Sequence, residues 1–168
     1  MSASSSGAES SRLPALAAVL AVAHAGLIWW LSSNSLEGVV PAGPTWGFFG
    51  NSFHFVLFGV LALLLAEAFR REGSLTRAQL ALVLLLVLAY GIVDEWHQRY
   101  TPHRSCDPAD VCVDLLGGVG CVALWWGVRG PGRFGVAVAR LFAVGGITLA
   151  FNAWRTWGPR VTSGRGGP

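Results

Sequence analysis

Residues 91–118, GIVDEWHQRYTPHRSCDPADVCVDLLGG, join two strongly apolar runs at 78–93 and 111–128. They hold five of the nine acidic residues, together with two histidines and two arginines. Each apolar run approaches the length that a helix needs to cross the hydrocarbon core of a bilayer. The stretch therefore predicts a polar turn between two antiparallel transmembrane helices, with the rest of the chain as a membrane scaffold around it.

The composition is that of an integral membrane protein. The 168 residues are 53% hydrophobic and 12% charged, with a mean hydropathy of +0.53, whereas about 25% of the residues in a soluble domain are charged. All twelve basic residues are Arg, and they lie singly or in pairs at the ends of apolar runs, which favours topology signals over a nucleic-acid partner. The three cysteines, Cys106, Cys112 and Cys121, lack CxxC spacing, which argues against a disulfide framework or a zinc site.

Four apolar runs predict transmembrane helices, at 13–31, 52–69, 78–93 and 111–128. The first run is too long for the apolar region of a signal peptide, so we expect it to be retained. A fifth run at 134–154 is weaker because it contains Arg140, and a central Arg costs roughly 2.5 to 3.5 kcal/mol on insertion scales. We expect an all-α, polytopic transmembrane helical bundle of four to five spans.

The domain layout follows from these runs. We expect a disordered tail at 1–12, a transmembrane domain at 13–154 and a flexible tail at 155–168, with a helix break in the Ser-, Gly- and Pro-rich segment 32–50. A re-entrant fifth segment is the alternative to a fifth span, because Arg155, Arg160 and Arg165 would otherwise lie outside. The loop 70–77 has three Arg against one Glu, so the positive-inside rule places it in the cytoplasm and the acidic turn on the opposite side.

Polar side chains gather on facing sides of the predicted hairpin. Asp94 and Gln98 are four residues apart and share a helix face, as do Asp110 and Asp114. The short connection 99–109 makes the two helices antiparallel neighbours, so the two faces meet and Arg104 folds back over the acids. Gly91, Gly117 and Gly118 are expected to let these helices pack closely. Perturbed carboxylates in such a cluster are candidates for a functional site.

Simpler interpretations exist for several of these residues. Asp107 suits a helix N-cap, Pro108 the first helical position, and Asp110 the third position of a capping box. Asp94 and Glu95 can mark a helix end, His24 and His54 can be packed and hydrogen-bonded, and Glu67 can pair with Arg70 or Arg71. A metal site built from His97, His103 and the carboxylates is disfavoured, because Arg104 is expected among them.

The stretch resembles the signature of the VanZ-like membrane proteins. The family pattern is an acidic pair, a Gln three residues later, a Pro and an Arg in the turn, then an Asp, a small polar residue four positions on and a Gly three beyond. These positions fall on Asp94, Glu95, Gln98, Pro102, Arg104, Asp110, Asp114 and Gly117, and a family His-Phe pair in the preceding helix is matched by His54-Phe55. The family usually has Asn where Asp114 stands, Gly where His103 stands, and Asp-Lys at positions 50–51.

The resemblance implies a multi-pass protein of the bacterial plasma (inner) membrane. The namesake is linked to low-level resistance to the glycopeptide teicoplanin, so the resemblance implies a role in the cell envelope and in antibiotic resistance, without an agreed reaction. The candidate ligand-binding residues are Asp94, Glu95, Gln98, Arg104, Asp110, Asp114 and His54. No catalytic residue is assigned, and no metal or cofactor is expected.

Three functions follow from this site. The first is binding of a polar or anionic envelope molecule, which could be a membrane lipid, a lipid-linked wall precursor or a glycopeptide. Arg104 is then expected to contact the anion. The second is an intramembrane hydrolase or transferase that uses paired carboxylates as acid and base. The third is a non-catalytic scaffold subunit. The sequence has no nucleophile elbow and no Lys, which favours binding over catalysis.

Overall fold

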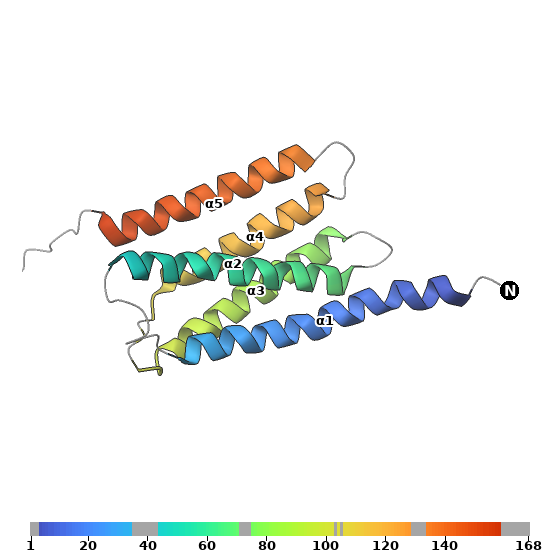
Figure 1. The fold of residues 1–168 in the computed structure, drawn as a ribbon, viewed down its shortest axis with the longest axis horizontal. Coiled ribbons are helices and arrows are strands. Elements are labelled where there is room, and N and C mark those ends of the chain that lie inside the picture. The colour runs from blue at the N-terminus through green and yellow to red at the C-terminus, as the bar shows by residue number, and fades with distance from the viewer. Residues whose placement is uncertain are drawn as a thin grey trace, which may run out of the picture.

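The protein is a bundle of five helices. The computed structural model describes residues 4–34, 44–70, 75–102, 104, 106–128 and 134–158. Its helices are α1 (Ser4–Ser33), α2 (Pro44–Phe69), α3 (Arg77–Gln98), α4 (Pro108–Val128) and α5 (Phe134–Trp157), and the described residues contain no strand (Figure 1). The predicted all-α bundle is confirmed.

Four of the helices are long and apolar enough to cross a membrane: Arg12–Ser33, Phe48–Phe69, Arg77–Gln98 and Pro108–Trp125. Many large apolar side chains of these segments point outward, among them Val19, Val22 and Leu85. An apolar exterior of this extent is unfavourable in water but suits contact with lipid chains. The chain is therefore a membrane protein with four candidate spans.

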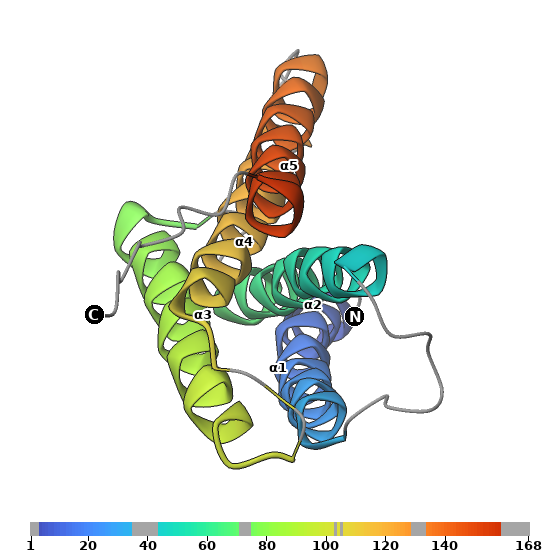
Figure 2. The ribbon, with the colours of Figure 1, turned by 90° about the vertical axis from the view of Figure 1, so that its left-hand side faces the viewer.

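Helix α2 lies at the centre and contacts all four other helices, while α5 packs beside α4 at the edge farthest from α1 and α3 (Figure 2). Ile28, Phe58, Val83 and Val87 are fully buried where α1, α2 and α3 meet. The backbones of α2 and α4 approach so closely that a Cβ on Gly117 would collide with the carbonyl oxygen of Phe55. Small residues permit such approaches between membrane helices.

This contact corrects the expected role of the glycines. Gly91 and Gly118 do lie between α3 and α4, where an added Cβ would meet Asp114 and Val87 at 3.0 Å. Gly117 instead faces α2. The sequence placed all three glycines at the interface of α3 and α4, but it could not tell which neighbour Gly117 would meet, because α4 contacts α2, α3 and α5.

The helices also extend beyond the predicted apolar runs. Helix α1 begins at Ser4, within the segment expected to be disordered, and α2 begins at Pro44, within the expected helix break. Helix α5 runs without a break from Phe134 to Trp157. An apolar run in the sequence marks the part of a helix that is suited to lipid, and the helix can continue beyond that run. Pro44 suits the first turn of α2, because the backbone N–H that Pro lacks would have no intrahelical partner there.

Candidate functional site

Buried polar side chains gather at the end of the bundle where α3 ends and α4 begins. The predicted residues Asp94, Glu95 and Gln98 come from α3, and Asp110 and Asp114 come from α4; all five are buried. Two further side chains contact them from other helices, the predicted His54 of α2 and the unpredicted Ser32 of α1. These seven residues are here called the polar cluster.

Asp94 is the most enclosed acid, with 0% of the residue exposed. Its Oδ2 accepts hydrogen bonds from the Ser32 hydroxyl at 2.8 Å and from the Gln98 amide at 2.9 Å. Its Oδ1 has no partner. Sequence reasoning missed Ser32 because it falls in a Ser-rich segment that predicted the end of a helix.

Asp114 contacts His54 across the interface of α2 and α4. Nδ1 of His54 lies 3.1 Å from Oδ1 of Asp114. The other oxygen, Oδ2, has no partner and lies against Gly91, where an added Cβ would approach it to 3.0 Å. A side chain at Gly91 would therefore crowd this carboxylate.

Glu95 connects the two helices of the hairpin. Its Oε2 accepts a hydrogen bond from the backbone N–H of Asp107 at 2.6 Å, and its Oε1 has no partner. Asp107 is the N-cap of α4 as predicted, since its Oδ1 accepts from the N–H of Ala109 at 2.9 Å. The predicted reciprocal half of the capping box is wrong, because Glu95 and not Asp110 takes the Asp107 N–H.

Asp110 instead pairs with a residue from α5. The Arg155 guanidinium donates to Oδ1 of Asp110 at 2.6 Å and also to Asp107. The sequence had placed Arg155 in the expected flexible tail 155–168, because this residue follows the end of the fifth apolar run at 154; Arg160 and Arg165 lie outside the described residues. The last turn of α5 places Arg155 over the start of α4.

The position of Arg104 corrects a central expectation. Its guanidinium donates to the backbone carbonyls of Leu31 at 3.1 Å and Asn34 at 3.3 Å, at the end of α1. Among the described residues it forms no ion pair with a carboxylate. The last carbonyls of a helix lack intrahelical partners and carry partial negative charge, so a guanidinium is stabilised there. Arg104 therefore caps α1 through Nη2, while its buried Nε has no hydrogen-bond partner.

The simpler interpretations hold for two residues away from the polar cluster. His24 Nε2 lies 2.9 Å from the Leu57 carbonyl, and Glu67 pairs with Arg70 at 2.6 Å. Among the residues that the structure describes, no three His, Cys, Asp or Glu side chains lie close enough together to hold a metal ion. His103, which belonged to the metal alternative, lies outside these residues, as do Arg71 and the basic turn 129–133.

Comparison with known proteins assigns the family. The sequence profile of the VanZ/LLP1 family matches residues 3–129, which includes α1 through α4 and the whole polar cluster. This chain belongs to the VanZ/LLP1 family. No curated protein and no solved structure matches it. Helix α5, which carries Arg155, lies beyond the matched residues.

The polar cluster offers hydrogen-bond acceptors more than donors. Asp94, Glu95 and Asp114 each keep one buried carboxylate oxygen without a partner. Ser32 and Gln98 each donate a hydrogen bond to Asp94, and the Arg155 guanidinium donates to Asp107 and Asp110. The arrangement can therefore accept hydrogen bonds from a hydroxyl or ammonium group, and it presents few groups to an anion.

Proposed function

We propose that this membrane protein binds the polar part of an envelope molecule at the polar cluster, and that the bound part presents hydroxyl or ammonium hydrogen-bond donors. The observation that supports this most strongly is the set of three unpaired oxygens on Asp94, Glu95 and Asp114. A buried polar atom without a partner costs about 1 to 3 kcal/mol, and such atoms are rare in native structures. A ligand that donates to all three would remove that cost.

The charge balance favours a donor-rich ligand over an anion. Arg104 donates through Nη2 to the end of α1 and keeps one buried donor, Nε, without a partner, and Arg155 donates to two carboxylates. An anion at the cluster would face Asp94, Glu95 and Asp114, none of which pairs with a guanidinium among the described residues. The hydroxyl or amine groups of a lipid-linked wall precursor or of a glycopeptide fit better, and with such a ligand the protein would act in glycopeptide tolerance.

The orientation belongs to the same proposal. The Arg-rich loop 70–77 would lie in the cytoplasm and the polar cluster toward the outer face of a bacterial plasma membrane. Labelling of Cys106 by a membrane-impermeant maleimide on intact cells tests this orientation, because Cys106 is exposed and lies between α3 and α4. Labelling that requires opened cells would mean the reverse orientation.

The test of binding uses Asp94→Asn. The Asn carbonyl can accept from Ser32 and Gln98, which turns its NH₂ toward the place of the unpaired Oδ1 and replaces an acceptor with a donor. We expect teicoplanin tolerance of expressing cells to fall to the vector level, and binding of teicoplanin or of a wall-precursor lipid to purified protein to weaken about tenfold or more. Glu67→Gln, at the opposite end of α2, is the matched control. Unchanged tolerance and binding in Asp94→Asn would refute the proposal.

The contact between His54 and Asp114 favours acid–base chemistry as a second candidate. A carboxylate that orients an imidazole is the arrangement used for general acid–base catalysis. Incubation of the wild type and His54→Gln with a lipid-linked precursor separates the two functions. If the protein is a catalyst, the wild type should convert the precursor to a new product and His54→Gln should not. If it only binds, the precursor should be recovered unchanged from both proteins.

A further inference from the structure

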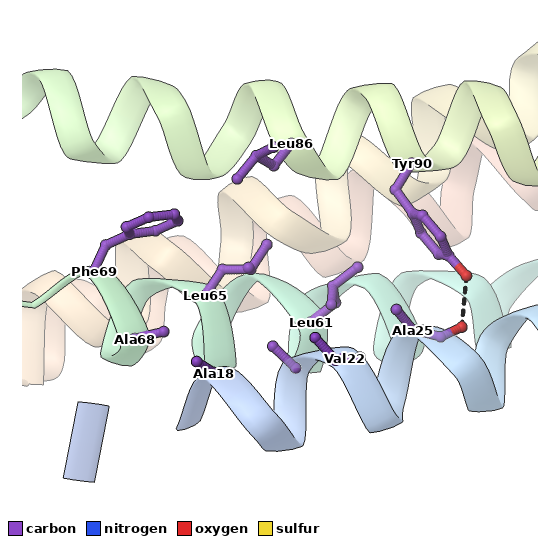
Figure 3. Close-up of a pocket in the computed structure, with 10 residues that line it drawn as sticks. Ala18, Val22, Ala25, Leu61, Leu65, Ala68, Phe69, Leu86 and Tyr90 are labelled. Carbon is purple, nitrogen blue, oxygen red and sulfur yellow. Dashed lines mark hydrogen bonds between the residues drawn. The ribbon is translucent and has the colours of Figure 1, made fainter. Parts of the chain in front are cut away.

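An apolar groove lies between α1 and α3, with α2 as its floor (Figure 3). Its volume is about 380 Å³, which lies within the range of roughly 300 to 1,000 Å³ of small-molecule sites. Ala18 and Ala25 on α1, Leu61 and Leu65 on α2, and Leu86 on α3 line it. The small side chains of α1 leave this space unfilled.

Polar contacts hold α1 and α3 together at the end of the groove nearest the polar cluster. The Tyr90 hydroxyl donates to the carbonyl of Ala25 at 2.5 Å, as Figure 3 shows, and Ser32 donates to Asp94 two turns farther along α1. Because Tyr90 uses its hydroxyl on Ala25, the groove offers little to a water molecule, which needs two or more polar partners to be held in a cavity.

The groove opens onto the membrane. Val22 and Leu86 line it and are themselves 75% and 38% exposed, and both belong to candidate spans. The surroundings of such side chains are lipid chains rather than water. The occupant that fits an apolar groove open to this medium is a hydrocarbon chain.

The groove and the polar cluster are consecutive along α3. Tyr90 lies one turn before Asp94 on the same face, and Leu86 lies about 12 Å from Asp94 along the helix axis at 1.5 Å per residue. Half of the hydrocarbon core of a bilayer is about 15 Å thick. A chain whose head group lies at the polar cluster can thus enter the end of the groove at Tyr90 and Leu86 within a single leaflet, whereas the end at Phe69 is farther from the cluster.

We propose that the groove between α1, α2 and α3 holds one hydrocarbon chain of the same lipid whose donor-bearing head group the polar cluster binds. The inference rests on the proposed function and narrows its ligand to a membrane lipid. The chain is then held by side chains of α1, α2 and α3, and the head group by the polar cluster, to which α4 adds Asp110 and Asp114.

The experiment uses the full chain in phosphatidylcholine nanodiscs that contain a trace of a photoreactive lipid with a diazirine in its acyl chain. One lipid carries a phosphatidylethanolamine head, whose ammonium group has N–H donors, and the other carries phosphatidylcholine, which has the same net charge and no donor. After irradiation, peptide mass spectrometry locates the label. Ala18→Phe and Val22→Phe fill the groove, Ala23→Phe on the exposed side of α1 is the control, and Asp94→Asn alters the head site.

We expect the phosphatidylethanolamine lipid to label the groove peptides of the wild type roughly fivefold more than the phosphatidylcholine lipid. Ala18→Phe and Val22→Phe should reduce this labelling by a similar factor, while Ala23→Phe leaves it unchanged. Val22 is exposed, so its variant keeps the test valid if Ala18→Phe fails to fold. Asp94→Asn should lower the phosphatidylethanolamine labelling to the level of phosphatidylcholine.

Each contrary result has a distinct meaning. Equal labelling of the Ala18→Phe, Val22→Phe and Ala23→Phe proteins would overturn the chain site and leave the head-group site standing. Groove labelling without any preference for the phosphatidylethanolamine head would overturn the link between the groove and the polar cluster, whereas the proposed function is overturned separately by unchanged teicoplanin binding in Asp94→Asn. A dimer in native mass spectra that Val22→Phe abolishes would assign the groove to a second copy of the chain and also overturn the inference.

Discussion

Nδ1 of His54 on α2 lies 3.1 Å from Oδ1 of Asp114 on α4. At Gly117, one turn farther along α4, the same two helices approach so closely that an added Cβ would collide with the carbonyl oxygen of Phe55. The polar contact and the tight packing therefore depend on each other: a shift of α4 away from α2 would separate the imidazole from the carboxylate. The site is built on the most closely packed pair of helices in the bundle.

Gly117→Ala should destabilise the protein strongly, because the new methyl group would collide with the Phe55 carbonyl, which is backbone and cannot rotate away. Overpacking of this kind typically costs about 1 to 3 kcal/mol. Gly26→Ala on α1 is the control, since no atom lies within 4 Å of its added Cβ, and Ala is favoured over Gly in helices. Thermal unfolding in detergent should show a lower midpoint for Gly117→Ala alone.

Arg155→Gln should loosen α5 from α4. It leaves Asp110, whose side chain is 12% exposed, without its charged partner, and this costs about 1 to 3 kcal/mol. The contact with Asp107 adds little because that side chain is 44% exposed. Arg140→Gln, an exposed position of the same helix, should leave stability unchanged. Equal unfolding midpoints for the two variants in detergent would argue against the bridge.

Ser32→Ala should weaken the attachment of α1 to α3. The Ser32 hydroxyl is a buried donor to Asp94, and the loss of a hydrogen bond to a charged group costs about 1.5 to 3 kcal/mol. Its neighbour Ser33 is exposed and bonds Trp29 and His97, so Ser33→Ala is expected to cost much less. Limited proteolysis between α1 and α2, compared for the two variants, should show faster cleavage of Ser32→Ala. Identical cleavage rates would mean that Ser32 does not hold α1.

The Cys106 thiol should titrate above its usual range. Desolvation, followed by the hydrogen bond and the charge of Glu95, raises its pKa, because each opposes formation of the thiolate. In a protein that carries Cys112→Ser and Cys121→Ala, the rate of iodoacetamide alkylation should therefore rise at higher pH than for a cysteine in a short peptide. Glu95→Gln removes the negative charge and should move the rise to lower pH. Coincident profiles for the two proteins would exclude Glu95 as a cause.

Hydropathy predicted the helices well, because a segment that crosses lipid must be long and apolar and must form all its backbone hydrogen bonds within itself, as a helix does. Each of the five predicted runs lies in a helix, and the four strongest overlap the candidate spans. Helical spacing also predicted that Asp94 and Gln98 meet, and they hydrogen-bond at 2.9 Å. Such contacts depend on the geometry of a single helix, which the sequence determines directly.

Contacts between segments were predicted less well. The path of a short connection decides where Arg104 points, and the uncapped carbonyls of α1 compete with the acids for its guanidinium. Ser32 and Arg155 reach the site from helices distant in sequence. Their roles depend on how α1 and α5 pack, and no local spacing in the sequence carries that information.

The central claim is that the unpaired carboxylate oxygens of the polar cluster bind the donor-bearing group of an envelope molecule. Native mass spectrometry of full-length protein, gently extracted from its membranes as wild type, Asp94→Asn and Glu67→Gln, tests it most directly. The account predicts one co-purifying lipid per chain in the wild type and in Glu67→Gln, with its occupancy reduced about tenfold in Asp94→Asn. A wild-type protein without a bound lipid, or equal occupancy in Asp94→Asn, would contradict it.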